Sequence, residues 1–288
     1  MANKEKNFSI GVDVGGTKMA GVLFDGVHVI ADYTLATPKD DLASFLNILS
    51  ALVGPLRERA KKEKAKIASI GIGLPGEIDN RDQKIYNAPN LPYLNGQKIA
   101  EQIKEKMGDD SAVYLSNDAK CFVRAEALAG AGKRYGSVFG VTIGTGIGSG
   151  WWTGGKAFEG SHSSAMELGL MVVDFKEKLG LEQAYHKLTQ SNPANLAEKA
   201  YRGDPLAEQA YAEVGEYLGI ALANVVNLLD PEIIVVGGGV VDSSDLFLPK
   251  VKKAMRHFIV DPQAREVKLV KAKLGPLAGA IGAALLVG

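Results

Sequence analysis

Two glycine-rich stretches of the sequence place hydroxyl, ammonium and carboxylate groups beside tight turns. The first stretch, IGVDVGGTKMAGVLFDG, carries at its turn Asp13, Gly15, Gly16, Thr17 and Lys18. Successive backbone N–H groups can converge on an anion at such a turn, because glycine has no Cβ to block the approach. The stretch matches neither the P-loop nor the dinucleotide-binding fingerprint. It therefore predicts a phosphate-binding hairpin of another kind, in which Thr17 and Lys18 supply side-chain donors.

A second stretch repeats the first about half a chain further on. FGVTIGTGIGSGWWTGG, residues 139–155, aligns with residues 10–26 without a gap, and both stretches have a strand, turn, strand pattern. Five positions coincide: Gly11 with Gly140, Val12 with Val141, Gly15 with Gly144, Gly21 with Gly150, and Gly26 with Gly155. The repeat predicts two related α/β halves. It also predicts a second phosphate turn that contains Gly144, Thr145, Gly146 and Gly148, although a pair of ordinary hairpin turns is the alternative.

Asp13 stands at the end of the first predicted strand, two residues before Gly15. A carboxylate beside a polyphosphate would repel it unless a cation lay between them. Asp13 is therefore predicted to hold Mg²⁺, directly or through a water molecule. The alternative is an aspartate that only caps the turn.

Asp118 is the candidate proton acceptor. It follows a predicted strand at 113–115 and opens a predicted helix that runs to about residue 130. A helix N-terminus favours an ionised carboxylate, which could accept a proton from an attacking hydroxyl group. Asn117 or Asp118 could instead be no more than the N-cap of this helix.

The elements that must position these residues alternate along the chain. Apolar patterning predicts strands at 9–14, 20–24, 66–73, 113–115, 138–143, 150–152 and 232–236, and helices at 40–62, 118–130, 206–229, 246–258 and 276–287. This interleaving predicts α/β layers. The expected division is an N-terminal lobe of residues 1–117 plus 276–288 and a C-terminal lobe of residues 118–275.

Composition limits the classes of function. The 288 residues contain 33 Lys+Arg and 33 Asp+Glu, so no net charge attracts nucleic acid or an acidic membrane surface. The single cysteine, Cys121, excludes an internal disulfide and a cysteine-rich zinc site. The opening MANKEKNFS lacks the apolar core of a secretory signal, and the apolar tail 277–288 is shorter than a membrane span. A soluble, cytoplasmic protein is expected.

Six motifs taken together resemble those of a known family. DVGGTK, GLPGEID, NAPNL, SNDAKCF, GTGIGSG and VVGGGV occur in this order, from about Ile10 to the C-terminus. This series resembles the ROK family of bacterial sugar kinases and repressors. The resemblance implies an α/β, two-lobed actin-like ATPase (ribonuclease H-like) fold, with ATP and sugar meeting in an interdomain cleft. It also implies ATP and Mg²⁺ as cofactors, Lys18 near the phosphates, and Asp118 as the catalytic base.

The resemblance further implies which residues bind sugar and nucleotide. Asn90 and Asn117 would hold sugar hydroxyls, as amide groups with both donors and acceptors can. The backbone at Gly76 would line the same pocket, and Glu167 would match the sugar-binding glutamate. Near the adenine, Gly238 and Gly239 follow an apolar strand and would allow close packing against a flat base, although a simple strand-to-helix turn would look the same.

The sequence departs from the family's pattern after Glu167. The family usually reads E-x-G-H, whereas Leu170 stands here at the histidine position, and MVVDFKEKLGLEQAY replaces the cysteine-rich zinc segment. A zinc site is therefore not expected. The second sugar-binding glutamate would be Glu182, but a gapless comparison from Gly180 places Gln183 there. Some polyphosphate-using glucokinases keep the E-L-G pattern, which leaves the phosphate donor open.

The expected activity is transfer of the γ-phosphate of ATP to a hexose, with glucose O6 as acceptor. A fructokinase, an N-acylhexosamine kinase, a polyphosphate-dependent glucokinase and a catalytically weak sugar sensor are the alternatives. A repressor would need a DNA-binding segment, and only nine residues precede Ile10. The resemblance also implies a homodimer or higher homo-oligomer. His162, five residues before Glu167, could touch the sugar or could be a solvated loop residue.

Overall fold

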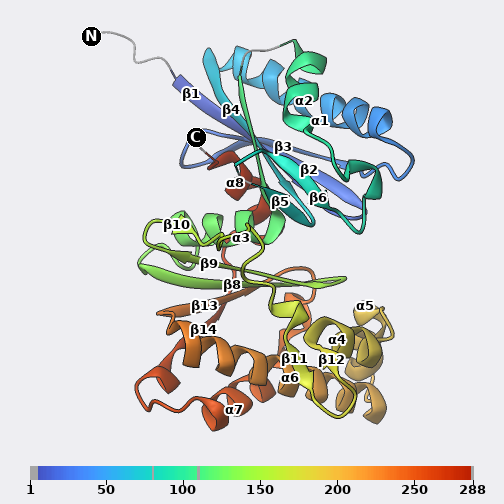
Figure 1. Ribbon diagram of the computed structural model, residues 1–288, viewed down its shortest axis with the longest axis vertical. Coiled ribbons are helices and arrows are strands. Elements are labelled where there is room, and N and C mark those ends of the chain that lie inside the picture. The colour runs from blue at the N-terminus through green and yellow to red at the C-terminus, as the bar shows by residue number, and fades with distance from the viewer. Residues whose placement is uncertain (1–5, 80, 109–110, 287–288) are drawn as a thin grey trace. The chain divides into compact units, whose positions relative to one another are not determined.

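The computed structural model describes residues 6–79, 81–108 and 111–286 (Figure 1). These residues form two compact units. The first unit contains residues up to 130, together with 159–165 and the C-terminal residues from 276. The second unit contains residues 131–158 and 166–275.

The first unit is built on a five-stranded sheet of order β3-β2-β1-β4-β7. Strands β1 (Lys6–Val14), β2 (Lys18–Phe24) and β3 (Val29–Ala36) are antiparallel neighbours, while β4 (Ala65–Leu74) and β7 (Ala112–Asn117) extend the sheet in parallel. The last six residues of β4 are all buried, as expected of a central strand covered on both faces. The carboxyl ends of β1, β4 and β7 therefore meet at one edge of the sheet.

Four helices cover this sheet: α1 (Leu42–Lys62), α2 (Ile99–Met107), α3 (Asp118–Leu128) and α8 (Ala278–Ala284). The predicted apolar stripe of α1, including Phe45, Leu49 and Leu52, is buried in one hydrophobic core with Ile10 and Val12 of β1. Side chains alternate between the faces of a strand. The residue between those two, Gly11, accordingly faces α8 on the opposite side.

Glycines allow α8 to pack with its backbone against its neighbours. A Cβ added to Gly11 would lie 1.9 Å from the carbonyl oxygen of Ala280, and one added to Gly71 would lie 1.8 Å from that of Ala283. On α8 itself, a Cβ on Gly282 would lie 1.7 Å from the carbonyl oxygen of Cys121 in α3. The small residues of the C-terminal helix are therefore required by close packing on β1, β4 and α3.

Gly282→Ala is expected to destabilise the protein by about 3 kcal/mol, because overpacking forces the backbone of α3 or α8 to move. The matched control is Gly54→Ala in the interior of α1, where an added Cβ meets nothing within 4 Å. That control should stabilise the protein by about 0.5–1 kcal/mol through helix propensity. Urea unfolding of both variants measures the difference. A neutral Gly282→Ala would contradict the packing described here.

The second unit repeats the plan of the first. Its sheet has the order β10-β9-β8-β13-β14. Strands β8 (Ser137–Ile143), β9 (Ile147–Thr153) and β10 (Lys156–Ala157) are antiparallel, and β13 (Ile233–Gly237) and β14 (Lys268–Lys271) are parallel to β8 and to each other. In the gapless alignment, the last residue of β1 falls on the last residue of β8, and the first residue of β2 falls on the first residue of β9. The predicted internal repeat is thus confirmed.

The helices of the second unit are α4 (Leu181–Thr189), α5 (Pro193–Tyr201), α6 (Pro205–Leu229) and α7 (Leu248–Phe258). Asp204 is the N-cap of α6, where its side chain accepts hydrogen bonds from the N–H groups of Leu206 and Ala207. Among the described residues, α6 is the one helix whose length and apolar composition would also suit a membrane span. Buried residues along α6 belong to the core of this unit, which accounts for that apolar composition.

Short elements complete the two units. In the first, β5 (Glu77–Asp79) pairs with β6 (Lys84–Asn87), and in the second, β11 (Val172–Asp174) pairs with β12 (Leu179–Gly180). Short segments of 3₁₀ helix lie at Pro92–Leu94, Leu168–Leu170, Val241–Leu246, Ala264–Glu266 and Gly275–Leu277. The β11–β12 hairpin is formed by the segment that follows Leu170.

The boundary between the units differs from the predicted one. We placed it between Asn117 and Asp118, but the first unit continues to Gly130 and also includes residues 159–165. The reason is the packing of α3. A Cβ on Gly73 of β4 would lie 3.2 Å from Cys121 Sγ, so α3 is in close contact with the first sheet as well as with α8.

Candidate active site

The turn between β1 and β2 is fixed by Thr37, which is only 6% exposed. Thr37 Oγ1 donates to the carbonyl oxygen of Gly15 at 2.8 Å, and its N–H donates to that of Thr17 at 3.0 Å. Within the turn, the N–H of Gly15 donates to the carbonyl oxygen of Lys18 at 2.9 Å. Thr37 directly follows β3, and no local motif in the sequence marks it as part of the site.

Asp13 and Asp118 approach each other at the carboxyl edge of the first sheet. Asp13 lies near the end of β1, and Asp118 follows β7 directly. Burial, and then the charge of Asp118, raise the pKa of Asp13 to about 7, while the ammonium of Lys18 acts in the opposite direction. Helix α8 adds to the crowding, since a Cβ on Gly279 would lie 2.5 Å from Asp13 Oδ2.

These surroundings suit a magnesium ion bound together with phosphate. Mg²⁺ usually keeps several waters and takes only one or two carboxylates besides substrate phosphates. The described residues contain no group of three or more His, Cys, Asp or Glu side chains that could hold a metal by themselves. Burial and the charge of Asp118 disfavour the ionised form of Asp13, and a cation bound beside it would favour that form. Asp13 therefore fits the role of a single carboxylate ligand.

The N-terminus of α3 separates the two roles left open for Asn117 and Asp118. Asn117 is the N-cap: its Oδ1 accepts from the N–H of Lys120 at 3.1 Å, and its Nδ2 donates to the carbonyl oxygen of Gly76 at 3.1 Å. Asp118 is the first residue of the helix, half-buried, and its Oδ1 accepts from the N–H of Ala119 at 2.8 Å. The helix dipole there favours the ionised carboxylate.

Two further predicted residues join this group. Gly76 has φ +114°, and a Cβ on it would lie 2.0 Å from the carbonyl oxygen of Asn87, so only glycine fits this contact. The side chain of Asn90 is exposed and lies 3.9 Å from the position a Cβ on Gly16 would take. The first unit therefore brings the predicted phosphate turn, Asp118 and the predicted amide groups together.

Helix α4 holds the second glycine turn. Tyr185 donates from its hydroxyl group to the carbonyl oxygen of Gly144 at 2.8 Å, and His186 Nε2 lies 2.6 Å from that of Thr145. A carbonyl oxygen can only accept, so this ring nitrogen carries the hydrogen. Glu182 Oε2 accepts from the N–H of Ile147 at 2.5 Å. Tyr185 and His186 were not predicted as site residues, although their spacing from Glu182 puts all three on one face of α4.

This contact gives Glu182 a structural role at the second turn, where a Cβ on Gly146 would be 2.5 Å from Oε2. Its role in binding sugar stays a prediction. Gln183 Oε1 accepts from the N–H of Gly180 and so caps α4. Gly148, expected in the turn, lies in β9 opposite Thr142.

Glu167 is exposed and directly precedes the 3₁₀ turn Leu168–Leu170. Ser149 of β9 fixes this segment, because its hydroxyl group contacts the carbonyl oxygen of Met166 and accepts from the N–H of Leu168 at 3.2 Å. Leu170, at the position where the family usually has histidine, is 71% exposed. The segment therefore presents one carboxylate and one apolar side chain at its surface.

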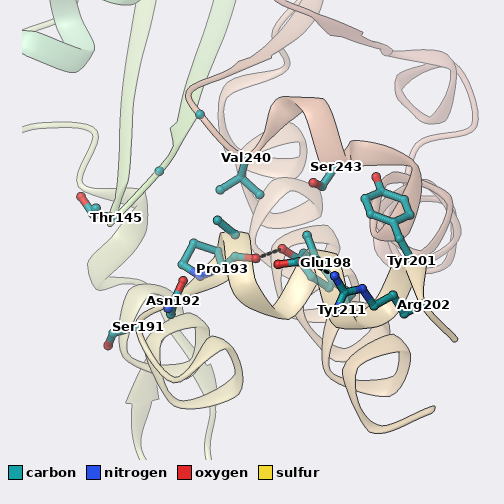
Figure 2. A pocket seen from close by; sticks show the side chains of 14 residues that line it. Thr145, Ser191, Asn192, Pro193, Glu198, Tyr201, Arg202, Tyr211, Val240 and Ser243 are labelled. Atoms are coloured by element: carbon teal, nitrogen blue, oxygen red, sulfur yellow. Dashed lines mark hydrogen bonds and ion pairs between the residues drawn. The ribbon is translucent and has the colours of Figure 1, made fainter. Parts of the chain in front are cut away.

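A pocket of about 750 Å³ opens beside the second turn, all of it within the second unit. Figure 2 shows Thr145 at one end, Val240 and Ser243 along one side, and α5 with Pro193 along the other. Its other lining residues are Gly144, Ser191, Asn192, Ala194, Ala197, Glu198, Tyr201, Arg202, Tyr211 and Gly239. Volumes of about 300–1,000 Å³ are typical of small-molecule and cofactor sites.

Of the two glycines predicted near the adenine, only Gly239 lines this pocket. Gly238 has φ +90° and packs against β8, since a Cβ would lie 2.3 Å from the carbonyl oxygen of Ile143. Gly239 lines the pocket, and a Cβ there would meet nothing within 4 Å. Tyr211 forms part of the pocket wall and donates from its hydroxyl group to the carbonyl oxygen of Pro193 at 2.7 Å (Figure 2).

Comparisons with known proteins identify what the chain is similar to. The model of the ROK family matches residues 9–288. An N-acetylgalactosamine kinase of Shewanella sp. (strain ANA-3) is 29% identical, covering 96% of this chain and 95% of that protein. A glucokinase of Streptomyces coelicolor is 28% identical, covering 96% of each.

A solved structure of a ROK family glucokinase from Streptomyces griseus, in complex with glucose and AMPPNP, is also similar. Its TM-score is 0.81 at 26% identity, covering 97% of this chain and 99% of that one. The relatives phosphorylate different sugars according to their names, at nearly equal identity to this chain.

Proposed function

The chain belongs to the ROK family, and from that premise we propose that it transfers the γ-phosphate of ATP to O6 of glucose. Its fold is the two-lobed actin-like ATPase fold of ROK sugar kinases. The observation that carries the proposal for this chain is the position of Asp118. It is the first residue of α3, at the carboxyl edge of the first sheet, and the phosphate turn and the predicted sugar amides belong to the same unit.

Asp118 accepts the proton of the attacking hydroxyl group in this proposal. The N–H of Ala119 holds Oδ1 and so orients the carboxylate. Asn117 caps α3 with its Oδ1 and holds the Gly76 turn with one amide hydrogen, and its second amide hydrogen can donate to a sugar oxygen. Asn90, exposed beside Gly16, offers a further amide group.

The phosphates would be held by the backbone N–H groups of Gly16 and Thr17, with the ammonium of Lys18 adding positive charge, while the N–H of Gly15 closes the turn on the carbonyl oxygen of Lys18. Asp13 would hold Mg²⁺, which when bound supplies charge neutralisation for the transferring phosphoryl group. In the second unit, Thr145 and Gly146 would supply N–H groups, since the N–H of Gly144 donates to the carbonyl oxygen of Gly146, and α4 fixes the shape of this turn. Fixed donors of this kind stabilise developing charge without reorganising during the reaction.

The 750 Å³ pocket is proposed to hold the nucleoside of ATP, because it contains Thr145 and Gly239 of the predicted nucleotide set. Ala194→Trp on α5 should raise the KM for ATP about ten-fold or more, since the indole fills the pocket, while the KM for sugar stays within about two-fold. The matched control is Asn195→Trp, the adjacent exposed residue of α5, which is not among the lining residues. Steady-state kinetics with either substrate varied measures both values.

Equal effects of these two substitutions on ATP would place the nucleoside elsewhere. A rise in the sugar KM alone would do the same.

A coupled ADP-release assay over glucose, mannose, fructose, N-acetylglucosamine and N-acetylmannosamine tests the acceptor. Glucose should give the highest kcat/KM, and polyphosphate in place of ATP tests the donor. Turnover that requires no sugar, or none with any sugar and donor, would contradict a hexose kinase.

An N-acetylhexosamine is the second candidate acceptor, favoured by Leu170. Its side chain is 71% exposed beside Glu167 and could contact the methyl group of an acetamide. A higher kcat/KM for N-acetylglucosamine than for glucose, reversed by Leu170→His, would support this alternative.

A further inference from the structure

Lys120 is a buried cation that the mechanism above does not use. It lies in the first turn of α3, two residues after Asp118, and is only 3% exposed. Its ammonium forms an ion pair with Glu159 and donates to the carbonyl oxygen of Ser163 at 2.8 Å. Burying an ammonium group costs free energy unless it is paired and hydrogen-bonded, as this one is.

Both partners of Lys120 belong to one closed loop, Glu159–Ala165, which is part of the first unit. The N–H of Ala165 donates to the carbonyl oxygen of Glu159 at 3.3 Å, so the ends of the loop meet. A Cβ on Gly160 would lie 2.8 Å from that of Ala165. Ser163 has φ +60°, a conformation that non-glycine residues rarely adopt.

The repeat shows that this loop is a departure from the common plan. In the alignment of Ile10 with Phe139, the loop corresponds to residues 30–36, which continue β3 in the first unit. In the second unit, the equivalent strand β10 ends at Ala157. The chain then contributes the loop to the first unit before it returns at Met166, next to Glu167.

The loop contributes little to the hydrophobic core of either unit. Ser161, His162 and Ser164 are exposed, and none of its residues belongs to the buried apolar clusters. Lys120 bonds on both sides of the tip formed by Ser161 and His162. The buried ammonium thus fixes the shape of a polar, exposed loop against the first turn of the helix that carries Asp118.

We propose that Lys120 is a positioning residue for the sugar: with Glu159 it holds the loop so that the tip residues Ser161 and His162 contact the sugar's hydroxyl groups. This inference rests on the proposed function. Neither Lys120 nor Glu159 needs to touch the sugar. Loss of their ion pair should therefore weaken sugar binding without removing the base.

Lys120→Met keeps the length of the side chain and removes its charge. The KM for glucose should rise about ten-fold or more, with kcat falling less than about three-fold and the KM for ATP unchanged within about two-fold. Glu159→Gln should act in the same direction with a smaller effect, about three-fold. Because both substitutions remove the same ion pair, the double variant should have a KM for glucose no higher than that of Lys120→Met. Lys133→Met, at an exposed lysine, is the control and should resemble the wild type.

Hydrogen exchange of the peptide that contains residues 159–165 gives a second readout that does not depend on turnover. Saturating glucose should slow its exchange in the wild type and have less effect in Lys120→Met. An unchanged glucose KM in both variants, or equal increases for glucose and ATP, would overturn the proposal. If Lys120→Met fails to fold, Glu159→Gln decides by the same criteria.

Failure of the proposed function would look different. The wild type would then show no sugar-dependent turnover and no glucose-dependent protection anywhere in the chain. If the wild type is active but glucose slows hydrogen exchange only outside residues 159–165, the inference about Lys120 is overturned and the proposed function is not.

Discussion

Asp118→Asn is expected to lower kcat about 10³-fold, within the range that a general base contributes. The amide cannot accept the proton of the sugar hydroxyl group, whereas the local structure should persist. Asparagine Oδ1 can still accept from the N–H of Ala119, and Asn117 remains the N-cap of α3. The KM for ATP should change less than about two-fold, because the base makes no contact with the nucleoside.

Two measurements separate loss of the base from general damage. Calorimetric binding of glucose should survive in Asp118→Asn, and its thermal unfolding should resemble that of the wild type. The matched control is Asp204→Asn at the N-cap of α6, where the side chain accepts from the N–H of Leu206 at 2.9 Å. Asparagine caps helices as well as aspartate does, so this variant should keep full activity. An Asp118→Asn enzyme with near-normal kcat would exclude Asp118 as the base.

Asp13→Asn is expected to change activity and stability in opposite directions. Loss of the proposed magnesium ligand should lower kcat/KM for ATP about 10²-fold, equivalent to losing one well-placed charge interaction with the phosphates. The same substitution should stabilise the metal-free protein. The native structure holds the Asp13 carboxyl in crowded surroundings beside Asp118, which disfavours its ionised form.

The stability effect depends on pH in a defined direction. The pKa of Asp13 is raised to about 7 in the folded protein, from an ordinary value of 3.8 for an aspartate side chain. Well below pH 3.8 the carboxyl is protonated in both the folded and the unfolded state and costs nothing. As pH rises towards 7 the unfolded state releases its proton first, so the stability of the wild type falls. Above pH 7 the cost is constant.

Asparagine cannot titrate, so the advantage of Asp13→Asn over the wild type should grow from pH 4 to pH 7. We expect it to reach about 1–2 kcal/mol, less than the full shift would give because Asp13 is partly accessible. Urea unfolding in EDTA at pH 4, 6 and 8 measures this. Asp32→Asn on the exposed surface of β3 is the control and should show no such trend. A stability difference that is independent of pH would show that the carboxyl ionises normally in the folded protein.

The sequence alone predicted those structural features whose pattern lies in residues close together along the chain. The glycine turns and the alternating apolar residues on either side of them predicted both hairpins, and the structure has them at aligned positions. Helical spacing predicted α1 and α6 to within a few residues of their bounds. Asp118 could be placed at a helix N-terminus because a short strand and a polar pair precede an apolar helix. Each of these inferences depends on residues that are neighbours along the chain.

Other features depend on contacts between residues far apart in sequence. Thr37 fixes the first turn from the end of β3, and α4 fixes the second turn with three side chains that no motif contains. The sequence did not predict that the carboxylate of Glu182 accepts a backbone N–H of the second turn. The pocket wall contributed by α5 also escaped prediction, since that helix was not expected.

What the sequence by itself determined is the repeated hairpin plan, the positions of the two glycine turns and the place of Asp118 at a helix N-terminus. Only the tertiary structure showed that α3 belongs to the first unit and that the loop Glu159–Ala165 joins it. It also showed which glycines of α8 are needed for close packing. The physical reason is that backbone preferences and apolar periodicity act over a few residues. Whether a glycine meets a carbonyl oxygen, or a lysine meets a carboxylate, depends on which distant segments the core brings into contact.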